Sequence, residues 1–384
     1  MRNQRPVFDA DGHVIEPPNV WTDTLDPSLR SRVEPDAARL GAVCGALLPI
    51  VDGHPTFAGS PMMTDYLRSG SAAKMQAERF GIDAEQGIAP GTFVSAMDTE
   101  GIDVSAVYPS YGLHVPYCQD LDAAIAIGLA RAYNRWLGGW CADTAGRVIP
   151  VALAPLHDPE LAVEEIARSV REDGSRAVML RPNPIAGRPL HHRANDRVFA
   201  TLADLGVAMI VHEGRGGNVR FLGEDRFDTW YASRAACHPM EAMAAFAGLV
   251  VEGVFDRFPN LRVGFLESGT GWLPYWLDRL DEHHEMWGPS ERPDLECRPS
   301  EYFARQCVIS GETDDKFLES VMASVGAERV MWASDYPHME CAYPESVSGL
   351  LASTALSPEA LSELLWGTPS RLYGVDARPE TSKA

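Results

Sequence analysis

The feature that most constrains the fold is an alternation of short apolar, β-rich runs with longer segments of helical periodicity. The β-rich runs span residues 7–11, 104–109, 148–155, 177–182, 207–214, 261–269, 306–311 and 330–337. Helical patterns lie between them at residues 121–141, 160–171, 196–205, 240–257 and 314–325. Strands joined by helical crossovers pair in parallel, and eight such strands close a barrel. The sequence therefore predicts an α/β fold, a (β/α)8 TIM barrel.

The alternative is an open, doubly wound sheet. No G-x-G-x-x-G pattern follows the first β-rich run, which disfavours that option.

One long segment interrupts the alternation. About ninety residues separate the first two β-rich runs, far more than one crossover needs. We predict an insertion over residues 16–99, rich in Pro, Gly and Met, that forms a lid over the barrel mouth. Together with this insertion, residues 1–376 should form one domain, and residues 377–384 a disordered tail.

Charge and composition exclude several classes of function. The formal net charge of −21 argues against a nucleic-acid partner, since phosphate binding needs clustered Lys and Arg. No apolar run reaches membrane-spanning length, and no signal peptide is visible, so we expect no membrane partner. The seven cysteines include no C-x-x-C pair, which disfavours disulfides and thiolate zinc and fits a cytoplasmic protein.

Ligand-type side chains follow several of the predicted strands. In the first run, a period of two places Asp9, Asp11 and His13 on one side, where two of them could chelate one ion. His212 lies near the end of the fifth run, and Asp335 lies near the end of the eighth. Because barrel enzymes work at the carboxyl ends of their strands, these residues are candidate metal ligands.

Glu267 stands at the end of an otherwise apolar sixth run. Burying an unpaired carboxylate is costly, so we expect Glu267 to bind a cation or to pair with His238 or Arg181 as an acid/base couple. A further hypothesis is that Arg181 and the lid bind an acidic group of the substrate.

Three motifs together resemble the amidohydrolase-related family, also called amidohydrolase 2. They are the segments DADGHVIE at 9–16, GVFDRFPNL at 253–261 and ASDYPH at 333–338, and LRPNP at 180–184 also fits. The resemblance covers nearly the whole chain. It implies a metal-dependent hydrolase or a decarboxylase of aromatic acids.

The resemblance also implies roles for individual residues. Asp11 and His13 occupy the first-strand ligand positions, His212 the fifth-strand position and Asp335 the eighth-strand position. Arg181 stands where relatives in the wider superfamily carry a bridging lysine, so that bridge is absent. Asp335 would also accept a proton from metal-bound water.

The sixth strand departs from the pattern of the decarboxylases, which carry a histidine where this chain has Glu267. A few relatives hold two ions, and Glu267, His238 and His283 resemble their second site. We therefore expect one or two divalent ions, Fe, Mn or Zn, because imidazole and carboxylate ligands suit these metals.

These observations leave several functions open. The main prediction is a hydrolase that uses metal-activated water on a small-molecule ester, thioester, lactone or amide. The alternatives are a non-oxidative decarboxylase of an aromatic or unsaturated acid, a non-haem iron oxygenase, and a binding barrel without catalysis. We expect a small-molecule substrate and a possible homodimer.

Overall fold

The computed structural model describes residues 5–35, 49–56, 71–82, 86–214 and 219–375. Within them, one sheet has eight parallel strands in the order β1-β5-β6-β7-β8-β9-β10-β11, as the sequence predicted. The strands are β1 Phe8–Val14, β5 Val104–Pro109, β6 Val148–Leu153, β7 Ala177–Leu180, β8 Ala208–His212, β9 Val263–Leu266, β10 Cys307–Gly311 and β11 Val330–Trp332.

The first and last strands of the sheet meet at their carboxyl ends. The amide of Asp335 donates to the carbonyl of Asp11 at 2.9 Å, and the amide of His13 donates to the carbonyl of Tyr336 at 2.7 Å. The sheet therefore closes through backbone hydrogen bonds at the level of the predicted metal ligands.

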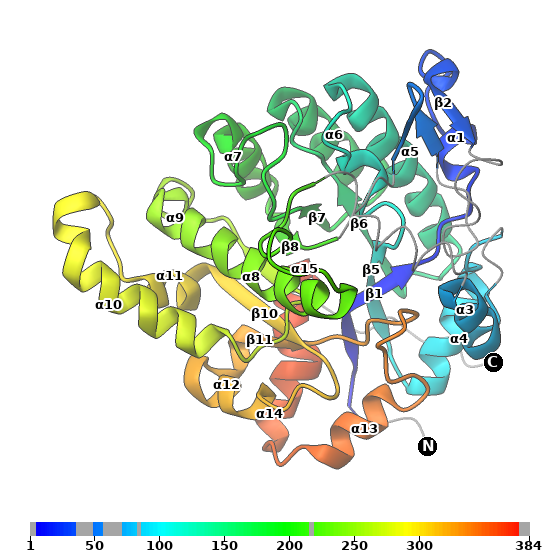
Figure 1. The fold of residues 1–384 in the computed structure, drawn as a ribbon. Coiled ribbons are helices and arrows are strands. Elements are labelled where there is room, and N and C mark those ends of the chain that lie inside the picture. The colour runs from blue at the N-terminus through cyan, green and yellow to red at the C-terminus, as the bar shows by residue number, and fades with distance from the viewer. Residues whose placement is uncertain (1–4, 36–48, 57–70, 83–85, 215–218, 376–384) are drawn as a thin grey trace.

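Helices surround the strands, and α10 extends away from the barrel (Figure 1). The barrel helices are α4 Pro90–Glu100, α5 Ala123–Ala142, α6 Pro159–Glu172, α7 Asp196–Leu205, α8 Trp230–Val251, α10 Leu273–Glu291 and α12 Leu318–Val325. Shorter or C-terminal elements are α9 Val254–Arg257, α11 Pro299–Gln306, α13 Ser346–Ser353, α14 Pro358–Ser362, η5 Glu363–Gly367 and α15 Thr368–Tyr373. No helix in the described part of the chain is long and apolar enough to cross a membrane.

Helix α8 begins ten residues earlier than the sequence predicted, at Trp230 instead of position 240. The side chain of Thr229 accepts a hydrogen bond from the amide of Ala232 and so caps the helix start. Pro239 lies inside the helix, although proline favours the first turn. His238 is therefore a residue of the helix and does not precede it.

A β-bulge interrupts β1 between Asp9 and Gly12. The extra residue changes which side chains share a face. Asp9 turns away from the predicted ligands and accepts hydrogen bonds from Ser105 Oγ and Ser334 Oγ, both at 2.8 Å. The prediction that Asp9 shares a side with Asp11 and His13 was therefore wrong for Asp9.

The described part of the insertion contains α1 Val20–Asp23 and an antiparallel sheet of β2 Val33–Pro35, β3 Pro49–Val51 and β4 His54–Pro55, followed by α3 Ser71–Phe80. Arg79 of α3 donates hydrogen bonds to the carbonyls of Met339, Cys341 and Tyr343. The insertion thus contacts the loop that follows β11. The predicted tail, residues 377–384, lies outside the described residues.

Candidate metal centre

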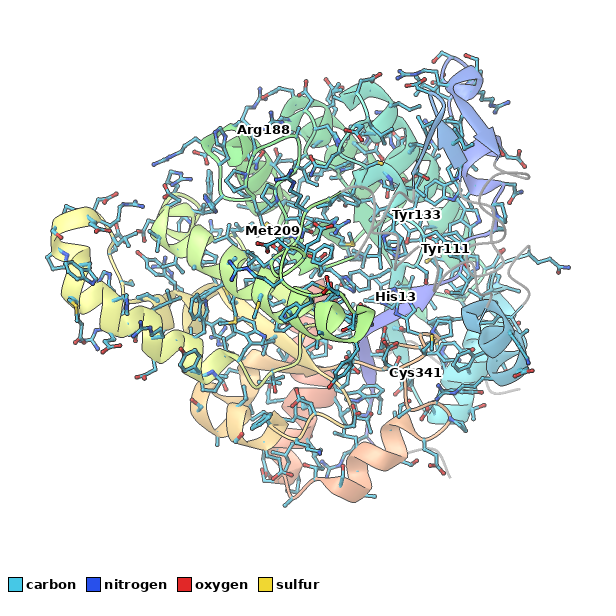
Figure 2. All side chains as sticks on the ribbon, viewed as in Figure 1. His13, Tyr111, Tyr133, Arg188, Met209 and Cys341 are labelled. Carbon is cyan, nitrogen blue, oxygen red and sulfur yellow. The ribbon has the colours of Figure 1, made fainter. Side chains whose placement is uncertain are left out.

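The four residues predicted as ligands of one ion lie together at the carboxyl ends of β1, β8 and β11. His13 Nε2 is 3.3 Å from Asp11 Oδ1 and 3.3 Å from Asp335 Oδ1. His212 Nε2 is 3.5 Å from Asp11 Oδ2. All four side chains are buried, and His13 is labelled in Figure 2. The structure thus brings together residues that are up to 324 positions apart, since Asp11 and Asp335 meet directly.

The two histidines are held in the orientation that a metal ligand needs. His13 Nδ1 lies 2.8 Å from the carbonyl of Pro109, and His212 Nδ1 lies 2.7 Å from the carbonyl of Glu213. A carbonyl only accepts, so each Nδ1 carries the proton. Each Nε2 then directs a lone pair toward the carboxylates, which is the tautomer of metal-bound histidine.

Several buried polar atoms at this site lack a hydrogen-bond partner within the described residues. They are His13 Nε2, His212 Nε2 and Asp11 Oδ1. Leaving a buried polar group without a partner costs roughly 1–3 kcal/mol each, so convergence of several such atoms calls for a ligand. Two imidazole nitrogens and two carboxylates fit a divalent cation.

Electrostatics at the site point the same way. Burial would raise the pKa of Asp11, but His212 and His13 outweigh it and hold that pKa below its usual range. Burial would lower the pKa of His212, but Asp11 and Glu267 raise it to about 9. Asp11 therefore attracts a positive partner, and a metal ion would take the place of the proton on His212.

A second group of ligand-type side chains adjoins the first. His13, Glu267, Asp335 and His338 each place one ligand atom within 4.8 Å of the others. His338 Nδ1 is 2.7 Å from Asp335 Oδ1, and the rings of His338 and His13 stack with centroids 3.8 Å apart. Glu267 Oε2 is 3.3 Å from His212 Nε2, so Glu267 touches both groups.

Backbone conformation aims the two carboxylates that follow β9 and β11. Glu267 has φ of 49° and Asp335 has φ of 54°, a left-handed conformation that side chains other than glycine rarely adopt. Such strain persists where the surrounding structure enforces it, and it collects at functional sites. β9 stops at Leu266, just before Glu267, and β11 stops at Trp332, three positions before Asp335, so both strands are shorter than the sequence predicted.

Burial and mutual repulsion affect the carboxyl groups around Glu267. Burial raises the pKa of Asp335 to about 8, against the opposing effect of His13. Burial, with Asp335 and Glu267 nearby, raises the pKa of Glu312 to about 9. Burial and then Asp335 raise the pKa of Glu267. Asp335 and Glu312 therefore favour the protonated form unless a cation offsets burial and the repulsion between the carboxylates.

His238 also lies beside Glu267. Its Nδ1 is 2.9 Å from the Glu267 carbonyl and 3.5 Å from Glu267 Oε1. The structure thus brings His238 to Glu267, as the sequence suggested.

Two of the predicted site residues lie elsewhere. His283 is exposed on α10. Its Nδ1 lies 3.0 Å from the carbonyl of Arg279, one turn earlier in the same helix. Its helix leads away from the barrel, so the prediction of His283 as a ligand was wrong.

Arg181 is buried and pairs with Glu213 at 2.8 Å, not with Glu267, so the predicted Arg181–Glu267 pair was also wrong. The fully buried Arg181 side chain is enclosed by protein, which gives no support to substrate binding by it.

Three residues at the mouth were missed. His338 follows Asp335 by three positions, inside a motif that was used only for the family resemblance. Glu312 follows β10 and shows the same signal as Glu267, an acid after an apolar run. Arg234, whose Nη2 is 3.3 Å from Glu267 Oε1, has no such signal because it comes from the interior of α8.

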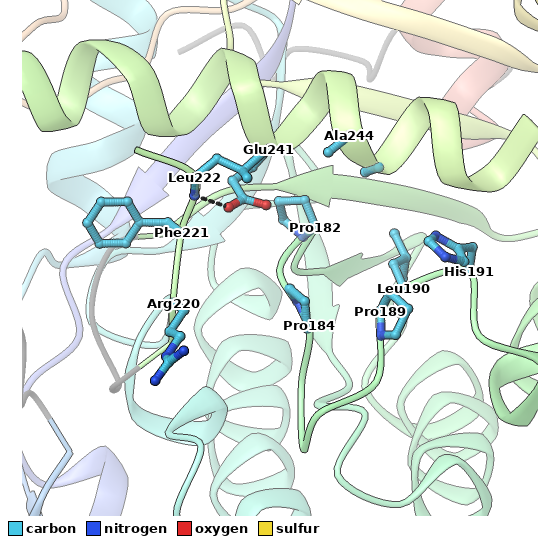
Figure 3. Close-up of a pocket in the computed structure, with 11 residues that line it drawn as sticks. Pro182, Pro184, Pro189, Leu190, His191, Arg220, Phe221, Leu222, Glu241 and Ala244 are labelled. Carbon is cyan, nitrogen blue, oxygen red and sulfur yellow. Dashed lines mark hydrogen bonds between the residues drawn. The ribbon is translucent and has the colours of Figure 1, made fainter. Parts of the chain in front are cut away.

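A cavity of about 270 Å³ lies between the loops after β7 and β8 and helix α8 (Figure 3). Its walls are largely apolar, with Pro182, Leu190 and Ala245 among them. Glu241 at its edge accepts a hydrogen bond from the amide of Leu222 at 2.6 Å. The loops that line the cavity follow the carboxyl ends of β7 and β8, the end of the barrel at which Asp11, His212 and Asp335 lie.

Comparison with known proteins identifies a family and several relatives. The amidohydrolase family model matches residues 102–375. The 2-amino-3-carboxymuconate-6-semialdehyde decarboxylase of Dictyostelium discoideum is 26% identical over 260 residues, 65% of this chain and 68% of that protein. A gamma-resorcylate decarboxylase of Rhizobium is 27% identical over 264 residues, 64% of this chain and 76% of that protein.

Solved structures share the fold. An amidohydrolase from Mycobacterium avium subsp. paratuberculosis has a TM-score of 0.76 and 24% identity, covering 97% of this chain and 100% of that one. A 5-carboxyvanillate decarboxylase from Novosphingobium aromaticivorans, solved with manganese and a nitrobenzoic acid, has a TM-score of 0.70 and 19% identity, covering 97% of each chain. These similarities establish the barrel architecture.

Proposed function

Because the chain belongs to the amidohydrolase family whose model it matches, we propose that it is a metal-dependent, non-oxidative decarboxylase of a small carboxylic acid. The observation that carries this proposal is the buried convergence of Asp11, His13, His212 and Asp335 at the barrel mouth. The two curated relatives described above are decarboxylases, which favours this alternative over the hydrolase that we expected first. By analogy with them, the substrate is a hydroxylated benzoate or an unsaturated acid.

The same four side chains would hold the metal ion. When bound, a divalent ion would supply positive charge that orients a substrate carboxylate or hydroxyl and stabilises its negative charge. Manganese, iron and zinc all suit two imidazole and two carboxylate ligands, and a decarboxylase of the same fold holds manganese.

Glu267 is our candidate for the proton donor. In decarboxylation the carbon–carbon bond to the carboxylate breaks, its electron pair stays on the substrate carbon, and that carbon gains a proton as CO₂ leaves. Glu267 follows β9 and lies 3.3 Å from His212 Nε2, beside the ligands. A positioned carboxyl group can deliver a proton as a histidine does, so Glu267 does not argue against decarboxylation.

A second candidate function is hydrolysis with two ions. The observation that favours it is the adjoining group of Glu267, Asp335 and His338, with His13, whose ligand atoms lie within 4.8 Å of one another. A pair of ions would strengthen the attack of water on an ester or thioester, and Asp335 would accept the proton of that water. The number of ions per chain separates the two functions.

We also propose that the insertion shapes the mouth of the site as part of a single domain. Its Arg79 holds three carbonyls of the loop after β11, the loop that contains Met339 and follows His338. Phe80 packs edge-on against Tyr336, which directly follows Asp335.

The test is an anaerobic turnover screen of the manganese-loaded protein. Hydroxybenzoates such as 2,6-dihydroxybenzoate are incubated beside a panel of aryl esters and thioesters, and products are identified by mass spectrometry. We expect one CO₂ for each acid consumed, and product formation without oxygen also excludes an oxygenase. Ester or thioester cleavage with no CO₂ release, together with two ions per chain, would replace the decarboxylase with the hydrolase.

A further inference from the structure

An arginine bridge crosses the mouth of the site above Glu267. Arg234 comes from α8, and its Nη2 lies 3.3 Å from Glu267 Oε1 and 2.8 Å from Glu340 Oε1. Arg234 Nε also donates to Glu340 Oε1, at 3.0 Å. Glu340 belongs to the loop after β11, so the bridge runs from the β8 side of the barrel to the β11 side.

The two carboxylates on this guanidinium differ in exposure. The Glu267 side chain is 8% exposed, whereas that of Glu340 is 48% exposed and that of Arg234 is 31% exposed. An ion pair that water reaches contributes about 0–1 kcal/mol, so Glu340 is a weakly held partner. Glu267 is fixed beneath the guanidinium, and Glu340 is free to leave it.

Arg234 is also a cation that faces the acidic mouth. The charge of Arg234 acts on Glu267, Asp335 and His338. Burial alone would lower the pKa of Arg234, but Glu267 and Glu340 keep that pKa high, so the guanidinium stays charged. Only the two oxygens of Glu267 separate its Nη2 from His212 Nε2, since each oxygen makes one of the two 3.3 Å contacts. A small acid bound beside His212 would therefore reach Arg234.

We propose that Arg234 binds a second anionic group of the substrate, and that Glu340 is the internal counter-ion which this group displaces. The inference rests on the proposed function for the reacting carboxylate and narrows its substrate to acids with two anionic groups. A second carboxylate matches the planar guanidinium through paired hydrogen bonds, which a single exposed Glu340 oxygen does not supply.

Calorimetry of the manganese-loaded full chain with two inert probes tests the proposal. Isophthalate carries two carboxylates and benzoate carries one. We expect isophthalate to bind roughly tenfold more tightly or better, since a charge-assisted hydrogen bond contributes about 1.5–3 kcal/mol. Glu340→Gln should tighten isophthalate binding severalfold and leave benzoate unchanged, whereas Arg234→Met should abolish the preference.

A matched pair elsewhere provides the control. Arg279 and Glu282 form a 3.1 Å ion pair on exposed α10, so Arg279→Met and Glu282→Gln should change neither affinity. Melting temperature and metal content are measured for every variant. If Arg234→Met does not fold, Arg234→Lys and Glu340→Gln still decide, because the first keeps the charge but not the paired geometry.

The proposal is overturned if a folded, metal-loaded Arg234 variant keeps the preference for isophthalate, or if Glu340→Gln shifts both probes equally. Because binding is measured without turnover, its failure is distinct from that of the proposed function. A preference that depends on Arg234, in a protein that releases CO₂ from no acid, would overturn the decarboxylase and leave this inference standing.

Discussion

Two buried groups of polar side chains in this barrel each contain carboxylates but differ in how completely those carboxylates are paired. Between α5 and α6, Glu165 accepts hydrogen bonds from Arg131, Arg168 and Asn134 at 2.6–2.9 Å. Every oxygen of that carboxylate has a partner. At the mouth, by contrast, His13 Nε2 and other buried atoms lack one within the described residues.

The difference teaches how to separate structural from functional charge. A satisfied buried network stabilises the fold and requires no ligand. A group with unsatisfied atoms costs stability, which a ligand repays when it binds. The two groups should therefore respond oppositely to mutation and to metal.

The largest effect should come from His212→Ala. This change removes one imidazole ligand, so we expect loss of bound metal and of essentially all turnover, while the fold remains. Elemental analysis and circular dichroism measure both. His283→Ala, on exposed α10, is the control and should bind metal normally; full metal occupancy in His212→Ala would contradict the assignment.

Glu267→Gln should come next. If Glu267 delivers the proton, kcat should fall roughly 10²–10⁴-fold, the usual contribution of a general acid or base. Metal content should stay at one ion per chain in a mononuclear site. A fall from two ions to one would instead show that Glu267 holds a second ion, and unchanged kcat would remove it from the mechanism.

The satisfied network should show the reverse pattern. Glu165→Ala leaves Arg168 and Arg131 without their shared buried partner, so we expect a loss of roughly 3 kcal/mol in the free energy of unfolding. Metal affinity and kcat should be unaltered. Urea denaturation measures stability, and a loss of metal from this variant would break the comparison between the two groups.

The smallest effect should be stabilisation by metal. If the mouth binds manganese only when folded, unfolding at a concentration 100 times the dissociation constant should cost about 2.7 kcal/mol more than in chelator. Thermal unfolding with and without manganese measures this. Glu165→Ala should gain as much as the parent, and an equal gain in His212→Ala would place the metal elsewhere.

Sequence patterns predicted correctly the features that depend on a single strand. Apolar runs located all eight strands, because a strand buried in a parallel sheet is apolar throughout. The ends were predicted too long at β8, β9 and β11, because the predicted runs included residues such as Glu213, Ser268 and Ser334 that follow the last residue of the strand. Residue type at those ends identified His212, Glu267 and Asp335 as members of the site.

Patterns failed where partners come from distant segments. His283 shares the sequence neighbourhood of Glu267, but α10 carries it away from the mouth. Arg181 reaches Glu213 because β7 and β8 are adjacent in the barrel. Arg234 and Glu340 are 106 residues apart, and no periodicity links them.

The sequence by itself determined the order of strands and helices and the residue types at each strand's end, because burial and periodicity act over a few residues. The tertiary structure alone decided which of those side chains meet. Closure of the barrel brings Asp11 against Asp335, and the bulge in β1 turns the buried Asp9 toward Ser105 and Ser334. Such contacts depend on strand register and chain path across hundreds of residues, which local propensity does not encode.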